Sequence, residues 1–176
     1  MLEDFCHFLF LKLPPEFSHK IGKFGMRHRI FAPGIYKTET SKIKLFDVEL
    51  PNALGLAAGF DKYAQLHNVV RDYGFGWIES GSFTEGGGKG NEGKRLERLE
   101  DGGLWNRMGL NCVSSYEASL IYGEVKDQTT FAPNIAKTHN PKIIGDKAIK
   151  DLVTSYNLLK KFGIYRSDVD EFRAVK

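Results

Sequence analysis

A chain of 176 residues with 41% hydrophobic and 12% aromatic residues can form a globular domain with a sizeable core. Its net charge of +3 is small and its charges are scattered, which argues against a nucleic-acid partner. The five histidines lack metal-ligand spacing, so we predict no metal site. Cys6 and Cys112 lie far apart without a motif and favour reduced thiols, although their pairing stays an alternative.

Residues 1–30 are expected to form a separate helical element. Its first part, Phe5–Leu13, is almost entirely apolar but much shorter than the roughly 20 residues that span a bilayer. After Pro14-Pro15, apolar residues at helical spacing are surrounded by basic ones: Phe17, Ile21 and Phe24 among Lys20, Lys23, Arg27 and Arg29. Two short helices of this kind fit a membrane-surface anchor, but helices that cap a barrel or pack on a core would show the same pattern.

The rest of the chain alternates between strand and helix patterns. Strands are predicted at 43–50, 55–58, 75–79 and 131–136, and helices at 64–73, from Ser114 toward Tyr122, and at 146–161. In the last helix, Ile149, Leu152, Val153, Tyr156 and Leu159 share one face. Residues 164–165 could begin another strand. About three βα units result, so the α/β class is expected, as a doubly wound sheet or part of an eight-unit barrel.

The stretch 81–103 is rich in glycine and is predicted to be a long, functional loop with a short strand at 95–99. Two nucleotide-binding motifs are excluded. Gly86–Gly90 is not followed by the Gly-Lys-Ser/Thr of a P-loop, and Glu79 stands where a dinucleotide fingerprint beginning at Gly74 needs its third glycine.

Small residues at the end of the 55–58 strand provide the first candidate site. Ala57, Ala58 and Gly59 would let a flat ring approach the backbone closely, although tight packing of a helix on the sheet would also select them. Lys62 follows them and offers a cation to an anionic ligand. Ser82 ends the next strand, and parallel strands place such residues at one edge of the sheet.

Asparagines mark two further candidate positions. Asn106 and Asn111 bound the run Asn-Arg-Met-Gly-Leu-Asn, and their side chains can both donate to and accept from a planar polar ring. Arg107 within this run could equally be structural. Asn134 interrupts an apolar strand, so its amide must bind a ligand or tie neighbouring loops together.

Taken together and in order, these stretches resemble the N-terminal half of the dihydroorotate dehydrogenase family over roughly residues 50–163. The resemblance rests on residues 55–62, 74–76, 79–82, 90–95, 106–111 and 134–137. The pair of N-terminal helices is similar to that of the membrane-associated, quinone-dependent class. The resemblance therefore implies a (β/α)8 TIM barrel of which this chain holds the first three or so units, preceded by the helical element. It also implies oxidation of dihydroorotate to orotate with FMN and electron transfer to a respiratory quinone, in pyrimidine biosynthesis.

Residue roles follow from the same resemblance. FMN contacts are implied for Ala57, Ala58, Gly59, Ser82 and Asn134, and substrate contacts for Lys62, Asn106, Arg107, Met108, Gly109 and Leu110. The expected domains are a membrane-associated element at 1–30, a partial FMN-binding barrel at 31–165 and a divergent polar tail at 166–176. The expected location is peripheral, on the cytoplasmic side of a bacterial inner membrane or on the mitochondrial inner membrane.

The strand that carries the catalytic base in the family has no counterpart in this sequence, where 166–170 reads Arg-Ser-Asp-Val-Asp. We therefore expect no catalytic residue within this chain and interpret it as truncated before the base. The alternative is an inactive flavin- or membrane-binding remnant that needs a second polypeptide.

Overall fold

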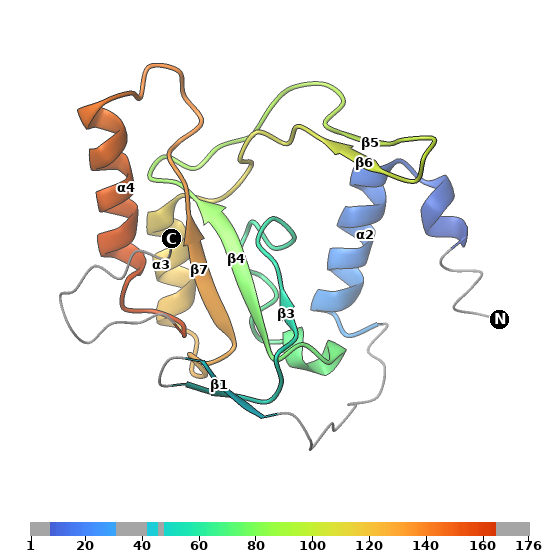
Figure 1. Cartoon of the computed structure of the whole chain (residues 1–176), viewed down its shortest axis with the longest axis horizontal. Helices are drawn as coiled ribbons and strands as arrows, with labels where there is room; N and C mark the ends of the chain where they lie inside the picture. The colour runs from blue at the N-terminus through green and yellow to red at the C-terminus, as the bar shows by residue number, and fades with distance from the viewer. Residues whose placement is uncertain (1–7, 31–41, 46–47, 165–176) are drawn as a thin grey trace.

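A parallel three-stranded sheet forms the centre of the molecule in a computed structural model that describes residues 8–30, 42–45 and 48–164. The strands are β3 (Gly55–Leu56), β4 (Trp77–Phe83) and β7 (Phe131–Ile135), in the order β3-β4-β7. The register pairs Gly55 with Trp77 and Ile78 with Phe131. Over the described residues the strands do not close into a barrel, so the α/β fold is an open segment of one (Figure 1).

The remaining elements surround this sheet. They are α2 (Pro15–Arg27), β1 (Ile43–Leu45), β2 (Val48–Leu50), the 3-10 helix η1 (Val70–Tyr73), β5 (Leu96–Arg98), β6 (Leu104–Asn106), α3 (Ser115–Gly123) and α4 (Asp146–Leu159). Residues 8–12 are also helical. In Figure 1, α3 and α4 lie together on the β7 side of the sheet. Helix α2 lies beyond β3, under the antiparallel β5–β6 hairpin.

Aromatic side chains from three elements form the middle of the core. Tyr122 of α3 stacks on Phe131 of β7 with ring centroids 4.0 Å apart, and Phe83 of β4 meets the same tyrosine edge to face. All three side chains are fully buried. The core therefore lies between the sheet and α3, and it packs against the carboxyl end of β4 and the amino end of β7.

The start of α3 confirms the predicted capping box. The Ser114 hydroxyl accepts a hydrogen bond from the Glu117 amide, and the Glu117 carboxylate accepts one from the Ser114 amide. Strands β1, β2, β5 and β7 and helix α4 also form within the predicted stretches. Strand β4 begins two residues later than predicted and continues through Phe83, so Ser82 lies within a strand.

The predicted helix over 64–73 is wrong. Ala64 has a left-handed backbone with φ of 53°, which an α-helix cannot accommodate, and only η1 at 70–73 is helical. The buried Asp61 carboxylate accepts the amides of Gln65 and Leu66 and so holds them in a turn. Leu66 and Val70 are nevertheless fully buried, because turns also deliver apolar residues at this spacing to the core.

The apolar face of α4 is buried only in part. Leu159 is buried, but Ile149 is 61% exposed and Val153 is 44% exposed. The buried face of the helix instead carries Asp151 and Ser155. Asp151 accepts the Thr138 amide at 2.9 Å, and Ser155 accepts the Ser115 hydroxyl at 2.8 Å. The inward-facing side of α4 thus makes hydrogen bonds to α3 and to the loop after β7.

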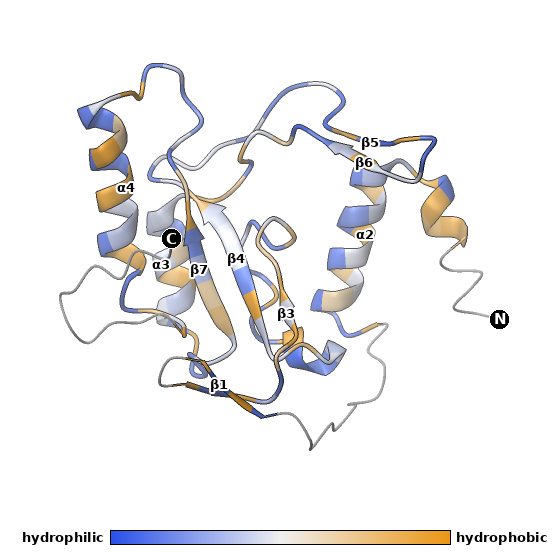
Figure 2. Cartoon of the chain, viewed as in Figure 1, coloured by the Kyte–Doolittle hydropathy of each residue, from blue (hydrophilic) through white to orange (hydrophobic). Residues whose placement is uncertain are grey.

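At the N-terminus, the two predicted helices are present, at 8–12 and in α2. The first is predominantly hydrophobic in Figure 2, and Phe8, Leu9, Leu11, Phe17 and Phe24 are exposed. Within the described ranges, no helix has the length and hydrophobicity required to cross a bilayer. The predicted tail at 166–176 lies outside the described residues. Ile164 donates its amide to Phe131 at 2.9 Å, which places it beside β7.

Candidate functional site

The carboxyl ends of β3 and β4 are joined by two backbone hydrogen bonds. The Gly59 amide donates to the Gly81 carbonyl, and the Gly81 amide donates to the Asp61 carbonyl, each at 2.9 Å. Because the strands are parallel, the loops that follow them leave the sheet at the same edge. The predicted Ala57–Gly59 and Ser82 positions are thereby brought together.

Asn134 of β7 joins the same group. Its side-chain carbonyl accepts a short hydrogen bond from the Ser82 hydroxyl, and its amide nitrogen donates to Glu79 at 2.7 Å. The sequence left two roles open for Asn134, namely ligand binding and a link between neighbouring segments. In the structure its side chain links β7 to β4. The side chain is only partly buried, so its second acceptor position can also serve a ligand.

The two glycines at this edge differ in the space beside them. Gly59 has a φ of 98°, and a methyl group built on its Cα would meet no atom within 4 Å. Gly81 also has a positive φ of 116°, but there the same methyl group would lie 2.6 Å from the Asn134 carbonyl oxygen. Gly81 is therefore required for close packing of the strands, whereas Gly59 leaves open space beside the exposed Ala57. The Ser82 hydroxyl oxygen and the second acceptor position of the Asn134 side-chain carbonyl remain able to accept hydrogen bonds from a ligand.

Lys62 follows the first loop and is held in place by Asn111. Its Nζ donates to the Asn111 side-chain oxygen at 2.9 Å, and the Asn111 amide donates to the Tyr63 hydroxyl at 3.5 Å. Burial, and secondarily the charge of Arg95, lowers the pKa of Lys62. Contrary to the sequence-based expectation, no helix begins here. The cation is positioned by a buried asparagine from the 106–111 run.

The predicted substrate residues at 106–110 separate into two groups. Asn106 and Arg107 are exposed; the Asn106 side chain accepts the Met108 amide, and Arg107 donates to the Glu92 carbonyl. Met108 is buried and lines a pocket with Lys62. Gly109 and Leu110 have left-handed backbones with φ of 70° and 53°. The structure thus brings Met108 close to Lys62 and leaves Asn106 and Arg107 on the hairpin surface.

Backbone hydrogen bonds join the glycine-rich loop to residues 108–112. The Gly88 amide donates to the Cys112 carbonyl and the Cys112 amide donates back, both at 3.0 Å, while the Asn91 amide donates to Met108. A methyl group on Gly90 would lie 2.2 Å from the Met108 carbonyl oxygen. The glycines therefore permit close packing of two backbones, which is a structural role for the predicted functional loop.

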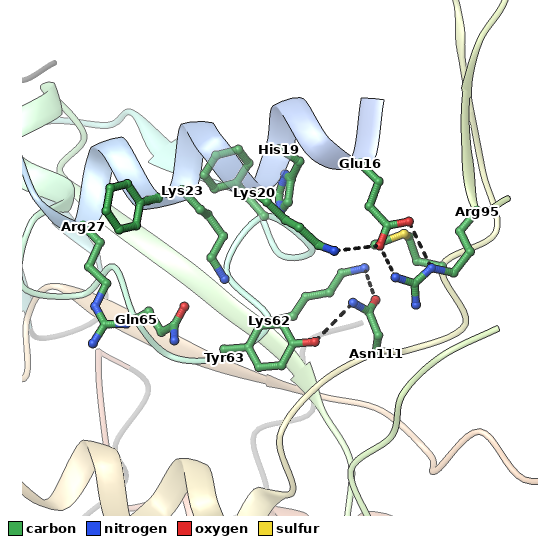
Figure 3. A pocket seen from close by; sticks show the side chains of 13 residues that line it. Glu16, His19, Lys20, Lys23, Arg27, Lys62, Tyr63, Gln65, Arg95 and Asn111 are labelled. Atoms are coloured by element: carbon green, nitrogen blue, oxygen red, sulfur yellow. Dashed lines mark hydrogen bonds and ion pairs between the residues drawn. The ribbon is translucent and has the colours of Figure 1, made fainter. Parts of the chain in front are cut away.

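A pocket of about 420 Å³ lies between α2 and the loop after β3 (Figure 3). Its lining comprises Glu16, His19, Lys20, Lys23, Phe24, Arg27, Phe60, Lys62, Tyr63, Gln65, Arg95, Met108 and Asn111. Its volume falls within the range of small-molecule sites. Lys62 and Met108 are shared between this pocket and the predicted substrate site, so the two sites are continuous.

Ion pairs hold α2 against this pocket. Arg95, which immediately precedes β5, makes two hydrogen bonds to the Glu16 carboxylate. These bonds lower the pKa of Glu16. Arg98 donates to the backbone carbonyls of Leu13 and Phe10, at 2.6 and 2.9 Å. Helix α2 is thus fixed to the β5–β6 hairpin by charge-assisted hydrogen bonds.

The sequence alone did not assign Glu16, His19 or Lys23 to a site. The positions of Lys20 and Lys23 in a basic pattern were visible, but that pattern indicated a surface helix. Only the packing of α2 against the loop after β3 shows that one face of α2 lines a pocket. Arg95 belongs to the 90–95 stretch singled out in the sequence. Its partner Glu16 lies 79 residues away in the chain.

The fold is a segment of a parallel α/β barrel, and its strand ends form the candidate site. The sequence profile of dihydroorotate dehydrogenase matches residues 40–169. A dihydroorotate dehydrogenase (quinone) from Christiangramia forsetii is 34% identical over 151 residues, which are 85% of this chain and 41% of that protein. One from Halobacterium salinarum is 39% identical over 108 residues, or 56% of this chain and 31% of that protein.

A solved structure has the same fold. Ligand-free DHODH from Eimeria tenella superposes with a TM-score of 0.71 at 22% identity, over 85% of this chain and 43% of that one. The chain spans less than half the length of the curated relatives and solved structures that it matches. It belongs to the dihydroorotate dehydrogenase family.

Proposed function

We propose that this chain carries the FMN- and orotate-contacting part of a quinone-dependent dihydroorotate dehydrogenase. The observation that supports this most is the convergence of Gly59, Ser82 and Asn134 at one sheet edge, next to Lys62. FMN, when bound, supplies the hydride acceptor for the oxidation of dihydroorotate to orotate. Ala57, Ala58, Gly59, Ser82 and Asn134 would hold it there.

Lys62 is the proposed contact for the substrate carboxylate. It already lies in a partly buried position with its ammonium oriented by Asn111, so little side-chain entropy remains to be lost on binding. Met108, Gly109 and Leu110 would contact the pyrimidine ring. We extend the proposal to Asn106 and Arg107 as the outer part of that site, which the substrate would reach from the hairpin side.

The pocket under α2 is the proposed quinone site, and the helical element 1–30 the proposed membrane contact. Phe8, Leu11 and Phe17 support this, because their side chains are 49–56% exposed and belong to helices that dock on the barrel through other residues. We infer a peripheral location on this basis. Vesicle sedimentation checks it: Phe8→Ser with Leu11→Ser should release the chain from vesicles that retain Leu104→Ser, an equally exposed control.

The proposed cofactor and substrate contacts are tested by orotate titration of the FMN-loaded chain. Orotate should perturb the visible flavin spectrum, and Lys62→Met should weaken its binding by about tenfold or more, the loss of one charge-assisted contact. Lys147→Met, which removes an exposed cation on α4, is the matched control. Orotate binding that is unaffected by Lys62→Met would contradict the proposed role.

A second candidate is a remnant that needs a second polypeptide. Two features favour it: the strands of the described residues do not close into a barrel, and α4 has exposed apolar residues. Anaerobic addition of dihydroorotate separates the two candidates. Bleaching of the bound flavin by this chain alone supports an active enzyme, whereas orotate binding without bleaching supports the remnant.

A further inference from the structure

The side chain of Asn111 lies between Lys62 and Tyr63 (Figure 3). Its oxygen accepts a hydrogen bond from the Lys62 Nζ at 2.9 Å, and its nitrogen donates to the Tyr63 hydroxyl at 3.5 Å. Asn111 is only 6% exposed. A reversed amide would direct its N–H groups at an ammonium that can only donate, so the oxygen is the atom that faces Lys62.

The backbone on the C-terminal side of Asn111 is fixed to both neighbouring loops. The Cys112 amide donates to the Gly88 carbonyl at 3.0 Å, and the Val113 amide donates to the Lys62 carbonyl at 3.4 Å. The second of these bonds joins the Asn111 segment directly to the residue that its side chain contacts. The amide of Asn111 is therefore presented to Lys62 from a backbone with little freedom to move away.

Tyr63, the second partner of Asn111, is held from the opposite side. The Lys23 ammonium of α2 lies 4.7 Å from the centroid of the Tyr63 ring. The Tyr63 amide donates to the buried Asp61 carboxylate at 3.4 Å. The hydroxyl that receives the Asn111 amide thus belongs to a ring that α2 and the turn after β3 both position.

The surroundings of Lys62 oppose its positive charge. Burial, followed by the charge of Arg95, lowers the pKa of Lys62. A neutral oxygen such as that of Asn111 favours the protonated amine without cancelling its charge, whereas a carboxylate at this position would neutralise it. The titratable groups of α2 and of the adjacent loops that lie around Lys62 are Glu16, His19, Lys20, Lys23, Arg95 and Cys112.

We infer that Asn111, oriented by Tyr63, is a positioning residue: it directs the Lys62 ammonium toward the substrate carboxylate and keeps it charged. The inference rests on the proposed function, in which Lys62 contacts that carboxylate. It differs from the expectation that both asparagines of the 106–111 run contact a planar ring. In the structure the side chain of Asn111 bonds to Lys62 and Tyr63 instead.

The charge of Lys62 can be followed directly in the full chain without flavin. NMR titration of ¹³C-labelled lysine, with the Lys62 signal assigned by its absence from Lys62→Met, reports the loss of the proton as the pH rises. Asn111→Leu should move this titration to lower pH, and Tyr63→Phe should move it less in the same direction. Asn111→Asp, which retains the size of the side chain, should move it to higher pH. Asn157→Leu, on the exposed side of α4, should leave it unchanged.

The consequence for the substrate is measured by orotate titration of the FMN-loaded chain at pH 7. Asn111→Leu and Asn111→Asp should each weaken orotate binding about fivefold to tenfold, the first by releasing Lys62 and the second by neutralising it. Because Asn111 acts through Lys62, adding Asn111→Leu to Lys62→Met should weaken binding no further than Lys62→Met alone.

The inference would be overturned by lysine titrations that coincide in the wild type and both Asn111 variants. A further loss of orotate affinity on adding Asn111→Leu to Lys62→Met would also overturn it, by showing that Asn111 contacts the substrate itself. Its failure is distinguishable from that of the proposed function. Orotate binding that is weakened by Lys62→Met, together with coinciding lysine titrations, contradicts only the inference. Orotate binding that ignores Lys62→Met contradicts the proposed role of Lys62, whatever the lysine titrations show.

Discussion

Lys23 of α2 reaches the fully buried carboxylate of Asp61, with Nζ 3.8 Å from Oδ1. The same carboxylate accepts the backbone amides of Gln65 and Leu66 at 2.7 and 2.8 Å. One side chain therefore both shapes the turn after β3 and joins the N-terminal helix to the barrel. Since Lys62 is the next residue, the geometry of the proposed substrate contact depends on this connection.

Replacement of Asp61 by alanine should be severely destabilising. It would leave the largely buried Lys23 ammonium unpaired and two amides without their acceptor, a loss of about 3–5 kcal/mol in the free energy of unfolding. Urea denaturation followed by circular dichroism measures it. Glu100→Ala, at an exposed turn, should change stability by less than about 0.5 kcal/mol. A small loss for Asp61→Ala would show that the pair does not hold α2.

The Glu16–Arg95 pair should make the docking of α2 depend on pH. The hydrogen bonds from Arg95 lower the pKa of folded Glu16, with Lys20 and His19 adding smaller effects of the same sign. Its stabilising contribution is therefore complete above the unfolded-state pKa of about 4.3 and is lost as the pH falls through the lower folded-state value.

Glu16→Gln should remove this part of the acid dependence and cost about 1 kcal/mol at pH 7. Denaturation midpoints from pH 7 to pH 3 provide the measurement. If the wild type and Glu16→Gln lost stability in parallel over that range, the pair would not contribute.

The capping box of α3 should be worth measurable stability. Ser114→Ala removes the acceptor for the Glu117 amide, and helix N-caps of this type contribute about 0.5–2 kcal/mol. Thermal unfolding should shift downward accordingly. Ser119→Ala, within the same helix, removes a hydroxyl that only donates to the Tyr116 carbonyl and should have a smaller effect. Equal shifts would mean that the cap contributes nothing specific.

Cys112 should react slowly with thiol reagents in the folded chain. It is 4% exposed, and burial raises its pKa, so both access and the thiolate fraction are low. With Cys6 replaced by serine, a colorimetric thiol assay at pH 8 should detect slow modification in buffer and rapid modification in denaturant. Rapid modification in buffer would show that the 106–112 run opens readily.

Capping motifs and hydrophobic periodicity predicted many of the strands and helices, because each depends on residues that are close together in the sequence. Ser114 and Glu117 are three residues apart and predict a helix start regardless of distant contacts. The prediction of a helix at 64–73 was wrong because the apolar spacing showed only that Leu66 and Val70 are buried. In the structure they are buried by a turn, which the Asp61 carboxylate stabilises, and by a short 3-10 helix. The periodicity of α4 does not show that Asp151 and Ser155 face inward, because they bond to Thr138 and Ser115, which lie elsewhere in the sequence.

The candidate site shows the same division. Small residues after β3 and the asparagine within β7 were visible as exceptions in apolar strands, and the structure brings them to one edge. The cationic pocket was not visible, because it requires Glu16 and Arg95 to meet across 79 residues. A contact between residues so far apart in the chain leaves no pattern in residue spacing or hydrophobic periodicity.

The flavin site at these strand ends is tested by the retention of FMN after gel filtration. The full chain, after incubation with FMN, should elute with flavin absorbance close to one equivalent. Asn134→Leu should lower this retention, whereas Asn157→Leu on the exposed side of α4 should not. A colourless, folded chain that elutes without flavin would contradict the claim that these strand ends form a flavin site.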